Sequence, residues 1–183
     1  MILDVMLTIM DTEDQIEELV DTLGAALSEY GYTERETGEL DNIPFTARLM
    51  TPRRRTTRYI CAISRIPRNV SDLPACRRFF EDTRTCLRKQ YACFPWWKEL
   101  GTYSVILCGA QQFQDLSGDF GAFKERTGLH MNVMLGTCFI DIENFKSSAD
   151  STWGLYHSGK HFGAVREAVR QWCQQCDTET QLA

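Results

Sequence analysis

The chain has 183 residues, of which 43% are hydrophobic, 25% charged and 11% aromatic, and its formal net charge is −5. This composition is that of a compact globular domain and excludes a disordered chain, a collagen-like repeat and a membrane protein. A chain of this length buries roughly 70% of its unfolded surface, so a core can form without disulfides or metals. We expect a single domain over residues 1–183, with residues 177–183 as a disordered tail.

The first ten residues lack the features of a secretory signal peptide. Their apolar stretch has no basic start and is followed directly by acidic residues. No apolar run approaches the ~20 residues needed to cross a bilayer. We expect a cytoplasmic protein without membrane contact, in which the eight cysteines are reduced thiols.

Charge is distributed unevenly along the chain. Residues 1–50 carry 12 acidic and 2 basic side chains, whereas residues 51–100 carry 4 acidic and 12 basic ones. This indicates either a dipolar surface or two elements that neutralise each other when they pack. We favour neutralisation, and a basic face for an anionic partner is the alternative.

Periodicity predicts a strand and then a helix at the start of the chain. Apolar residues alternate over 2–10, which is typical of a half-buried strand. A helix is predicted to begin near Asp11 and to end at Gly31, because apolar residues recur at helical spacing over 16–30. Residues 33–43 are polar, and we interpret them as a loop.

A hairpin and a second helix follow. Alternating segments at 45–49 and 59–63 predict two antiparallel strands joined by a basic tip at 52–56. The second helix is predicted to open at Ser71–Pro74, since proline is tolerated in a first turn, and to end before Pro95.

Two further strands and two helices complete the pattern. Strands are predicted at Tyr103–Cys108 and Met131–Ile142, the second apolar on both faces and therefore central. Helices are predicted around Phe120–Arg126 and from Lys160 to Cys176. The order β-α-β-β-α-β-α-β-α indicates an α/β (α+β) sandwich with about four helices and a single mixed sheet of about five strands.

The polar connector at 143–161 is the first candidate site. It holds two of the three histidines, a tryptophan and a tyrosine beside the best-defined strand, which suits a small-molecule cleft. His157 and His161 are the candidates for acid–base catalysis. A capped surface loop whose tryptophan covers the edge of the core is the alternative. The predicted ligand-binding residues are Trp153, Tyr156, Ser158 and Lys160, the lysine as an anion clamp.

No cofactor motif is complete. The segment 154–161 comes close to the phosphate-binding pattern G-x4-G-K-[ST], but His161 stands where the magnesium-binding hydroxyl is required. On one helix, His161 and Cys173 would lie ~18 Å apart, too far to share a zinc ion. Cys173 and Cys176 are expected to face the core. We predict no metal site and no cofactor.

Two acids at the end of the best strand leave one question open. Asp141 and Glu143 are two residues apart and would project on one face, as a divalent-cation pair does. Two acids at the solvent end of a strand is the simpler interpretation.

Arginines gather at the hairpin tip and on the second helix. The candidate contacts to nucleic acid or another anion at the tip are Arg53, Arg54, Arg55 and Arg58. The second helix adds Arg77, Arg84 and Arg88 as further candidate phosphate contacts. The acidic net charge is unlike that of nucleic-acid-binding domains, so nucleic acid is the less favoured partner. We expect these arginines to pair with the acidic first helix, through Glu13, Glu17, Glu18 or Asp21.

The densest aromatic segment is 94–97. Adjacent tryptophans seldom both face the core, so Trp96 or Trp97 is a candidate contact to a protein partner. Our leading hypothesis is a cytosolic binding or regulatory module acting through a protein partner or self-association. The alternatives are a small-ligand-binding enzyme with a cleft at 143–161 and a nucleic-acid-binding or nuclease-like protein. Whether the protein is an enzyme stays open.

Overall fold

The structure, a computed structural model, describes residues 2–52, 57–70, 72–91, 99–118, 132–151 and 158–182. Within the first helix, side chains are described from residue 13 onward. The elements follow one another as α1 (Ile2–Ser28), β1 (Glu34–Leu40), β2 (Ile43–Met50), β3 (Thr57–Arg65), α2 (Leu73–Tyr91), β4 (Glu99–Cys108), α3 (Ala110–Ser117), β5 (Asn132–Asp141), β6 (Lys146–Ser151) and α4 (Ser158–Leu182).

The six strands form one mixed sheet in the order β1-β2-β3-β4-β5-β6, which confirms the α/β class with one strand more than expected. β1, β2 and β3 form an antiparallel meander. β4 and β5 run parallel to β3, and β6 returns antiparallel to β5. The carboxyl ends of β3, β4 and β5 therefore meet at one end of the sheet.

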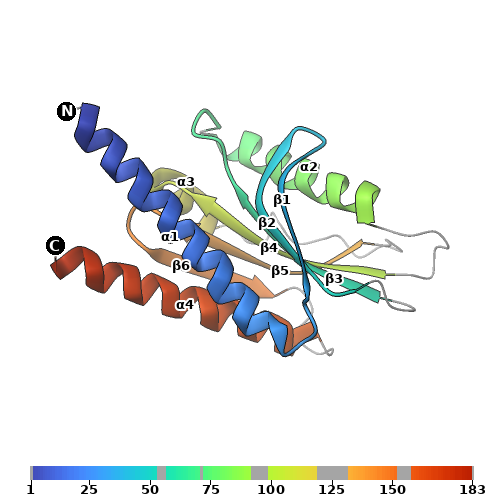
Figure 1. Cartoon of the computed structure of the whole chain (residues 1–183). Coiled ribbons are helices and arrows are strands. Elements are labelled where there is room, and N and C mark those ends of the chain that lie inside the picture. The colour runs from blue at the N-terminus through green and yellow to red at the C-terminus, as the bar shows by residue number, and fades with distance from the viewer. Residues whose placement is uncertain are drawn as a thin grey trace.

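Helices cover both faces of this sheet. α1 and α4 lie on one face, and both termini of the chain lie at the same end of the molecule (Figure 1). The indole Nε1 of Trp172 on α4 donates to the carbonyl oxygen of Gln15 on α1, at 3.0 Å. α2 and α3 lie on the other face, where Phe80 and Leu116 are buried against strand residues such as Phe139. The core is therefore divided into two layers by the sheet.

The predicted strand at 2–10 is wrong, because these residues are the first turns of α1. Alternation over so short a segment does not exclude a helix, since Leu3, Met6, Leu7 and Met10 also satisfy helical spacing. Leucine and methionine are in addition good helix formers. The helix therefore does not start near Asp11, but its predicted end at Gly31 is confirmed by the positive φ of that residue (81°).

Two strands were missed in polar segments. β1 occupies most of the segment 33–43 that we expected to be a loop, and its residues are almost all exposed. It joins β2 through Asp41 and Asn42, which both have positive φ (48° and 64°), as a two-residue hairpin turn requires. β6 lies inside the predicted connector 143–161. Neither strand shows apolar alternation, so periodicity could not find them.

Several other elements among the described residues lie where they were expected. The hairpin of β2 and β3, the strands β4 and β5 and the helices α2 and α4 lie where the sequence predicted them. Asp72 caps α2, because its Oδ1 accepts a hydrogen bond from the amide of Ala75 at 2.7 Å. α4 continues to Leu182, through most of the expected tail. The helix predicted at 120–126 lies outside the described residues. In the described part of the chain, no helix combines the length and apolarity needed to span a membrane.

Candidate functional site

A groove of about 520 Å³ opens at the carboxyl end of β3. Ligands of open α/β sheets bind preferentially outside the carboxyl ends of the strands, and pockets of this volume suit a small ligand or a few side chains. We call this surface the carboxyl-end groove. Its lining residues are Glu13, Pro44, Phe45, Thr46, Arg65, Ile66, Pro67 and Arg68.

The wall that follows β3 is held by hydrogen bonds to two neighbouring elements. The amide of Ile66 donates to the carbonyl oxygen of Leu107 on β4, at 2.9 Å. The side chain of Gln112, which is 9% exposed on α3, donates through Nε2 to the carbonyl oxygens of Pro67 and Val70. This wall is therefore anchored to the sheet and to α3, as a preformed binding surface requires.

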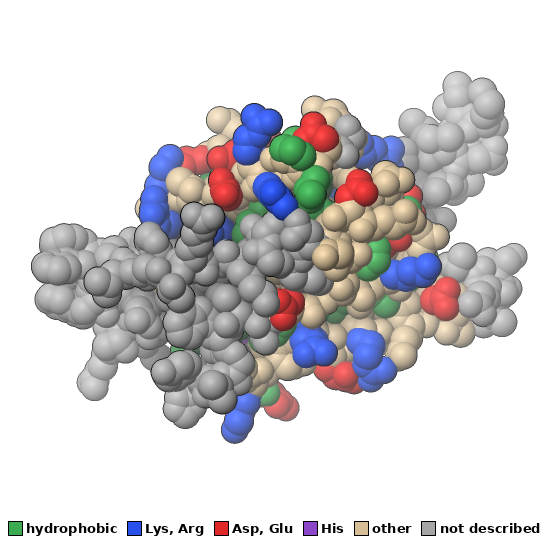
Figure 2. Space-filling view, turned by 180° about the vertical axis from the view of Figure 1, so that it is seen from behind, with side chains coloured by type: hydrophobic (Ala, Val, Ile, Leu, Met, Phe, Trp, Pro, Cys, Tyr) green, Lys and Arg blue, Asp and Glu red, His purple; other side chains and the backbone are tan. Residues whose placement is uncertain are grey.

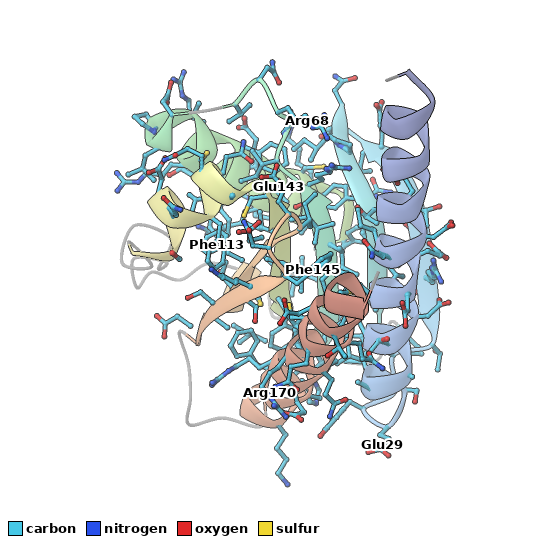
Figure 3. The ribbon with its side chains drawn as sticks, turned by 90° about the vertical axis from the view of Figure 1, so that its left-hand side faces the viewer. Glu29, Arg68, Phe113, Glu143, Phe145 and Arg170 are labelled. Atoms are coloured by element: carbon cyan, nitrogen blue, oxygen red, sulfur yellow. The ribbon has the colours of Figure 1, made fainter. Side chains whose placement is uncertain are left out.

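The groove combines apolar walls with two cations. Arg65 donates through Nη1 to Oε1 of Glu13 at 3.2 Å, which joins the end of β3 to α1. Arg68 also lines the groove and is exposed. It lies at the same end of the molecule as Glu143, far from Arg170 on α4 (Figure 3). Arg68 therefore offers an exposed guanidinium to a ligand of the groove.

Asp141 and Glu143 do not project together from a strand, because β5 ends at Asp141 and Glu143 lies in the following turn. Asp141 is 2% exposed, and its carboxylate accepts hydrogen bonds from the amides of Glu143 and Asn144 and from the side chain of Asn144, at 2.9 to 3.1 Å. Glu143 accepts from the amide of Ala110 at 3.2 Å, at the amino terminus of α3. Asp141 therefore stabilises the turn after β5, and Glu143 caps the amino terminus of α3.

His161 lies half-buried in a group of tyrosines at the other end of the sheet. Gly31 turns the chain after α1 so that Tyr30 and Tyr32 both approach the imidazole, with ring centroids 4.6 and 5.8 Å from it. The hydroxyl of Tyr32 lies 3.4 Å from Nδ1 of His161. Tyr59 on β3 and Tyr103 on β4 complete the group at 4.9 and 6.3 Å. We call these five residues the tyrosine cluster.

A glycine on β5 lets the start of α4 approach this cluster. A Cβ at Gly136 would lie 2.5 Å from the ring of Phe162, so only glycine fits there. Phe162 in turn stacks on Tyr103, with centroids 5.9 Å apart and an interplanar angle of 8°. Burial raises the pKa of the Tyr32 and Tyr103 phenols well above the ordinary value near 10. The phenols are therefore protonated at neutral pH.

The connector at 143–161 is not a single loop. It contains the turn after β5, the strand β6 and the first turn of α4. Trp153, Tyr156 and His157 lie outside the described residues. Ser158, Lys160 and His161 begin α4, with Lys160 exposed. Of the predicted site residues in this segment, the structure thus places only the imidazole of His161 among other functional groups.

Arg58 is held by groups of its own neighbourhood. Its Nη2 is hydrogen-bonded to the carboxylate of Glu34 on β1, and its Nε donates to the carbonyl oxygen of Thr51 at 3.2 Å. Its guanidinium also lies 5.2 Å from the centroid of the Tyr91 ring. The expected partner on α1 is therefore not used by this arginine. Arg53, Arg54 and Arg55 lie outside the described residues.

Other cations neutralise α1. Arg35 on β1 contacts both Glu17 and Asp21, the latter at 2.8 Å, and Arg65 contacts Glu13. Figure 2 shows the molecule from behind, on the side away from α1 and α4. On the described part of this side, charged side chains of both signs are interspersed, and hydrophobic ones form only small patches. Neutralisation is therefore local, between neighbouring elements.

The described cysteines are buried and free of disulfides: Cys61, Cys76, Cys86, Cys108, Cys138, Cys173 and Cys176. Burial raises the pKa of the Cys61 and Cys108 thiols to about 12 and that of Cys173 to about 11. A thiol with so high a pKa is a poor nucleophile and a poor metal ligand at neutral pH. The core-facing orientation expected for Cys173 and Cys176 is confirmed. No group of three metal-ligating side chains occurs among the described residues.

Sequence reasoning missed the carboxyl-end groove and the tyrosine cluster. Both collect residues from elements far apart in the chain, and the turn dipeptide at 41–42 was the only local signal for the hairpin beside the groove. Trp96 and Trp97 lie outside the described residues. No family model matches this chain, and neither a curated protein nor a solved structure matches it.

Proposed function

We propose that the protein is a binding module that takes a segment of a partner protein into the carboxyl-end groove. The observation that carries this proposal is the groove itself, with apolar walls from Pro44, Phe45 and Pro67 beside the guanidinium of Arg68. Apolar patches rimmed by polar groups are typical of protein-binding surfaces. We infer that the segment carries an acidic side chain next to an apolar one.

The chemistry of the described side chains favours binding over catalysis. Asp141 and Glu143 are engaged by backbone amides, and the described thiols are buried and protonated. An acid, base or nucleophile of an enzyme must be able to reach the substrate. None of these groups lines the carboxyl-end groove.

The two alternatives receive less support. A small-ligand site at the start of α4 would use His161, but its Nδ1 already lies beside the Tyr32 hydroxyl, and four phenol rings surround it. A nucleic-acid surface at the hairpin tip would use Arg58, which is engaged by Glu34 and Tyr91. Both alternatives therefore depend on residues already committed to contacts within the molecule.

Selection from a random peptide library displayed on phage tests the proposal. We expect the selected peptides to share an acidic side chain next to an aromatic, proline or aliphatic one. Arg68→Glu should weaken their binding about tenfold or more, because attraction becomes repulsion at the mouth of the groove. Glu13→Gln should strengthen binding, because it releases Arg65 for the peptide carboxylate.

Arg170→Glu is the matched control. Arg170 is an exposed arginine on α4 that pairs with Glu167, at the far end of the molecule (Figure 3). Its reversal changes the net charge equally and should leave the affinity unchanged. Equal losses for Arg68→Glu and Arg170→Glu would show that peptides respond only to overall charge, and the groove would then not be the site.

A further inference from the structure

The two edges of the sheet differ in how they are protected against pairing. β1 presents Glu34, Glu36 and Glu39, and its register against β2 shifts between Glu36 and Gly38. Charges and irregularities of this kind prevent edge strands from pairing with other chains. The β1 edge is therefore blocked.

β6 lacks the register shift of β1, and its two charged residues, Lys146 and Asp150, have opposite signs. It pairs with β5 in an unbroken register from Lys146 to Ser151 and contains no proline or glycine. Within the described part of the chain, no strand pairs with its other side. Ser148 and Ala149 are small and half-buried, so they place little bulk beside the backbone, and a further strand could be added at this edge.

We propose that β6 of one copy of this chain pairs antiparallel with β6 of a second copy, centred on Ser148. In this register Lys146 of each copy stands directly opposite Asp150 of the other, so the twofold axis creates two Lys–Asp pairs. Lys146, Ser148 and Asp150 share one face of the strand, because each is two residues from the next. Opposite charges placed directly across an antiparallel pair stabilise it.

Pairing β1 with a second copy of itself does not place complementary residues opposite each other along a regular strand. Centring β1 on Thr37 places Arg35 opposite Glu39, but Glu36 then faces Gly38, and the register shift lies at this centre. The sequence of β6 is thus complementary to itself along a regular strand, whereas that of β1 is not. The β6 edge is separate from the carboxyl-end groove. The proposed dimer therefore does not depend on the proposed function.

The dimer is expected to be weak. Six residues on each side bury far less than the roughly 1,200–2,000 Å² of a stable interface. We therefore expect a monomer at micromolar concentration and a dimer that accumulates towards millimolar concentration.

Sedimentation equilibrium of the full chain over this concentration range tests the proposal. Lys146→Asp and Asp150→Lys should each weaken the dimer about tenfold or more, since every substitution acts twice across the axis. The double exchange K146D/D150K restores both opposite-charge pairs, and its dissociation constant should return to within about threefold of the original. Lys160→Asp and Asp177→Lys, on exposed positions of α4, change the net charge equally and should have no effect.

Circular dichroism of each variant verifies that it is folded. Sedimentation as a monomer at every concentration would overturn the proposal. So would a dimer that both single variants leave intact, or a double exchange that stays as weak as the single variants.

Discussion

At the scale of the residue, His161 illustrates how a candidate catalytic group acquires a structural role. The sequence marked it because two of the three histidines lie within five residues here, beside a tryptophan and a tyrosine. The structure surrounds it with rings from the turn after α1, from β3 and from β4, which packing brings together and no local pattern predicts. The sequence therefore predicted neither the tyrosine cluster nor the carboxyl-end groove.

A pair of substitutions at His161 separates ring packing from hydrogen bonding. His161→Ala should lower the free energy of unfolding by about 2–3 kcal/mol, because it removes a ring that contacts four phenols. His161→Phe should cost less than His161→Ala, since it keeps the ring and loses the long hydrogen bond to Tyr32. Urea denaturation measures both values. Equal losses would show that the imidazole nitrogens, and not the ring, stabilise the cluster.

At the scale of the element, helices and strands were predicted correctly where a buried face gives the apolar residues a regular spacing. α2 and the strands β2 to β5 have faces that pack against the core, and apolar residues mark those faces. β1 and β6 are edge strands with few buried side chains, so their sequences reflect exposure rather than strand geometry. The prediction for the start of α1 was wrong for another reason: its apolar residues satisfy both the strand period and the helix period.

The contact between Glu143 and α3 gives a prediction at this scale. Glu143 follows β5, yet its carboxylate accepts a hydrogen bond from the first amide of an eight-residue helix. Glu143→Ala should cost about 1 kcal/mol of stability, because it leaves this amide without its partner and removes a negative charge from the positive end of the helix.

Amide hydrogen exchange shows where the loss falls. We expect faster exchange in α3 for Glu143→Ala, whereas Glu143→Gln keeps an acceptor oxygen and should lie between the alanine variant and the original. An unchanged exchange rate in α3 together with a global loss of stability would contradict a capping role.

At the scale of the whole molecule, buried thiols on both faces of the sheet link stability to alkaline pH. Burial raises the pKa of Cys61 and Cys108 to about 12 and that of Cys173 to about 11, from an ordinary value near 9. The folded protein therefore retains protons that the unfolded chain releases. The contribution of these thiols to the free energy of unfolding is fully present below pH 9. It falls as the pH rises towards the pKa values of the folded protein.

Urea denaturation at a series of pH values tests this linkage. The unfolding free energy should be constant between about pH 7 and 8, and above pH 9 each of these thiols should remove about 1.4 kcal/mol per pH unit. Cys61→Ala should give a shallower slope. A slope identical to that of the original protein would show that this thiol does not contribute.

The central claim, that the protein binds a partner segment in the carboxyl-end groove, is tested most directly by mapping where a selected peptide binds. The measurement is the change of backbone amide chemical shifts of the isotopically labelled protein as the peptide is added. We predict that the largest changes fall at the amides of residues 45, 46, 65, 66 and 68, with the start of α4 unaffected. Changes centred on His161 and Lys160, with residues 65–68 unaffected, would contradict the claim.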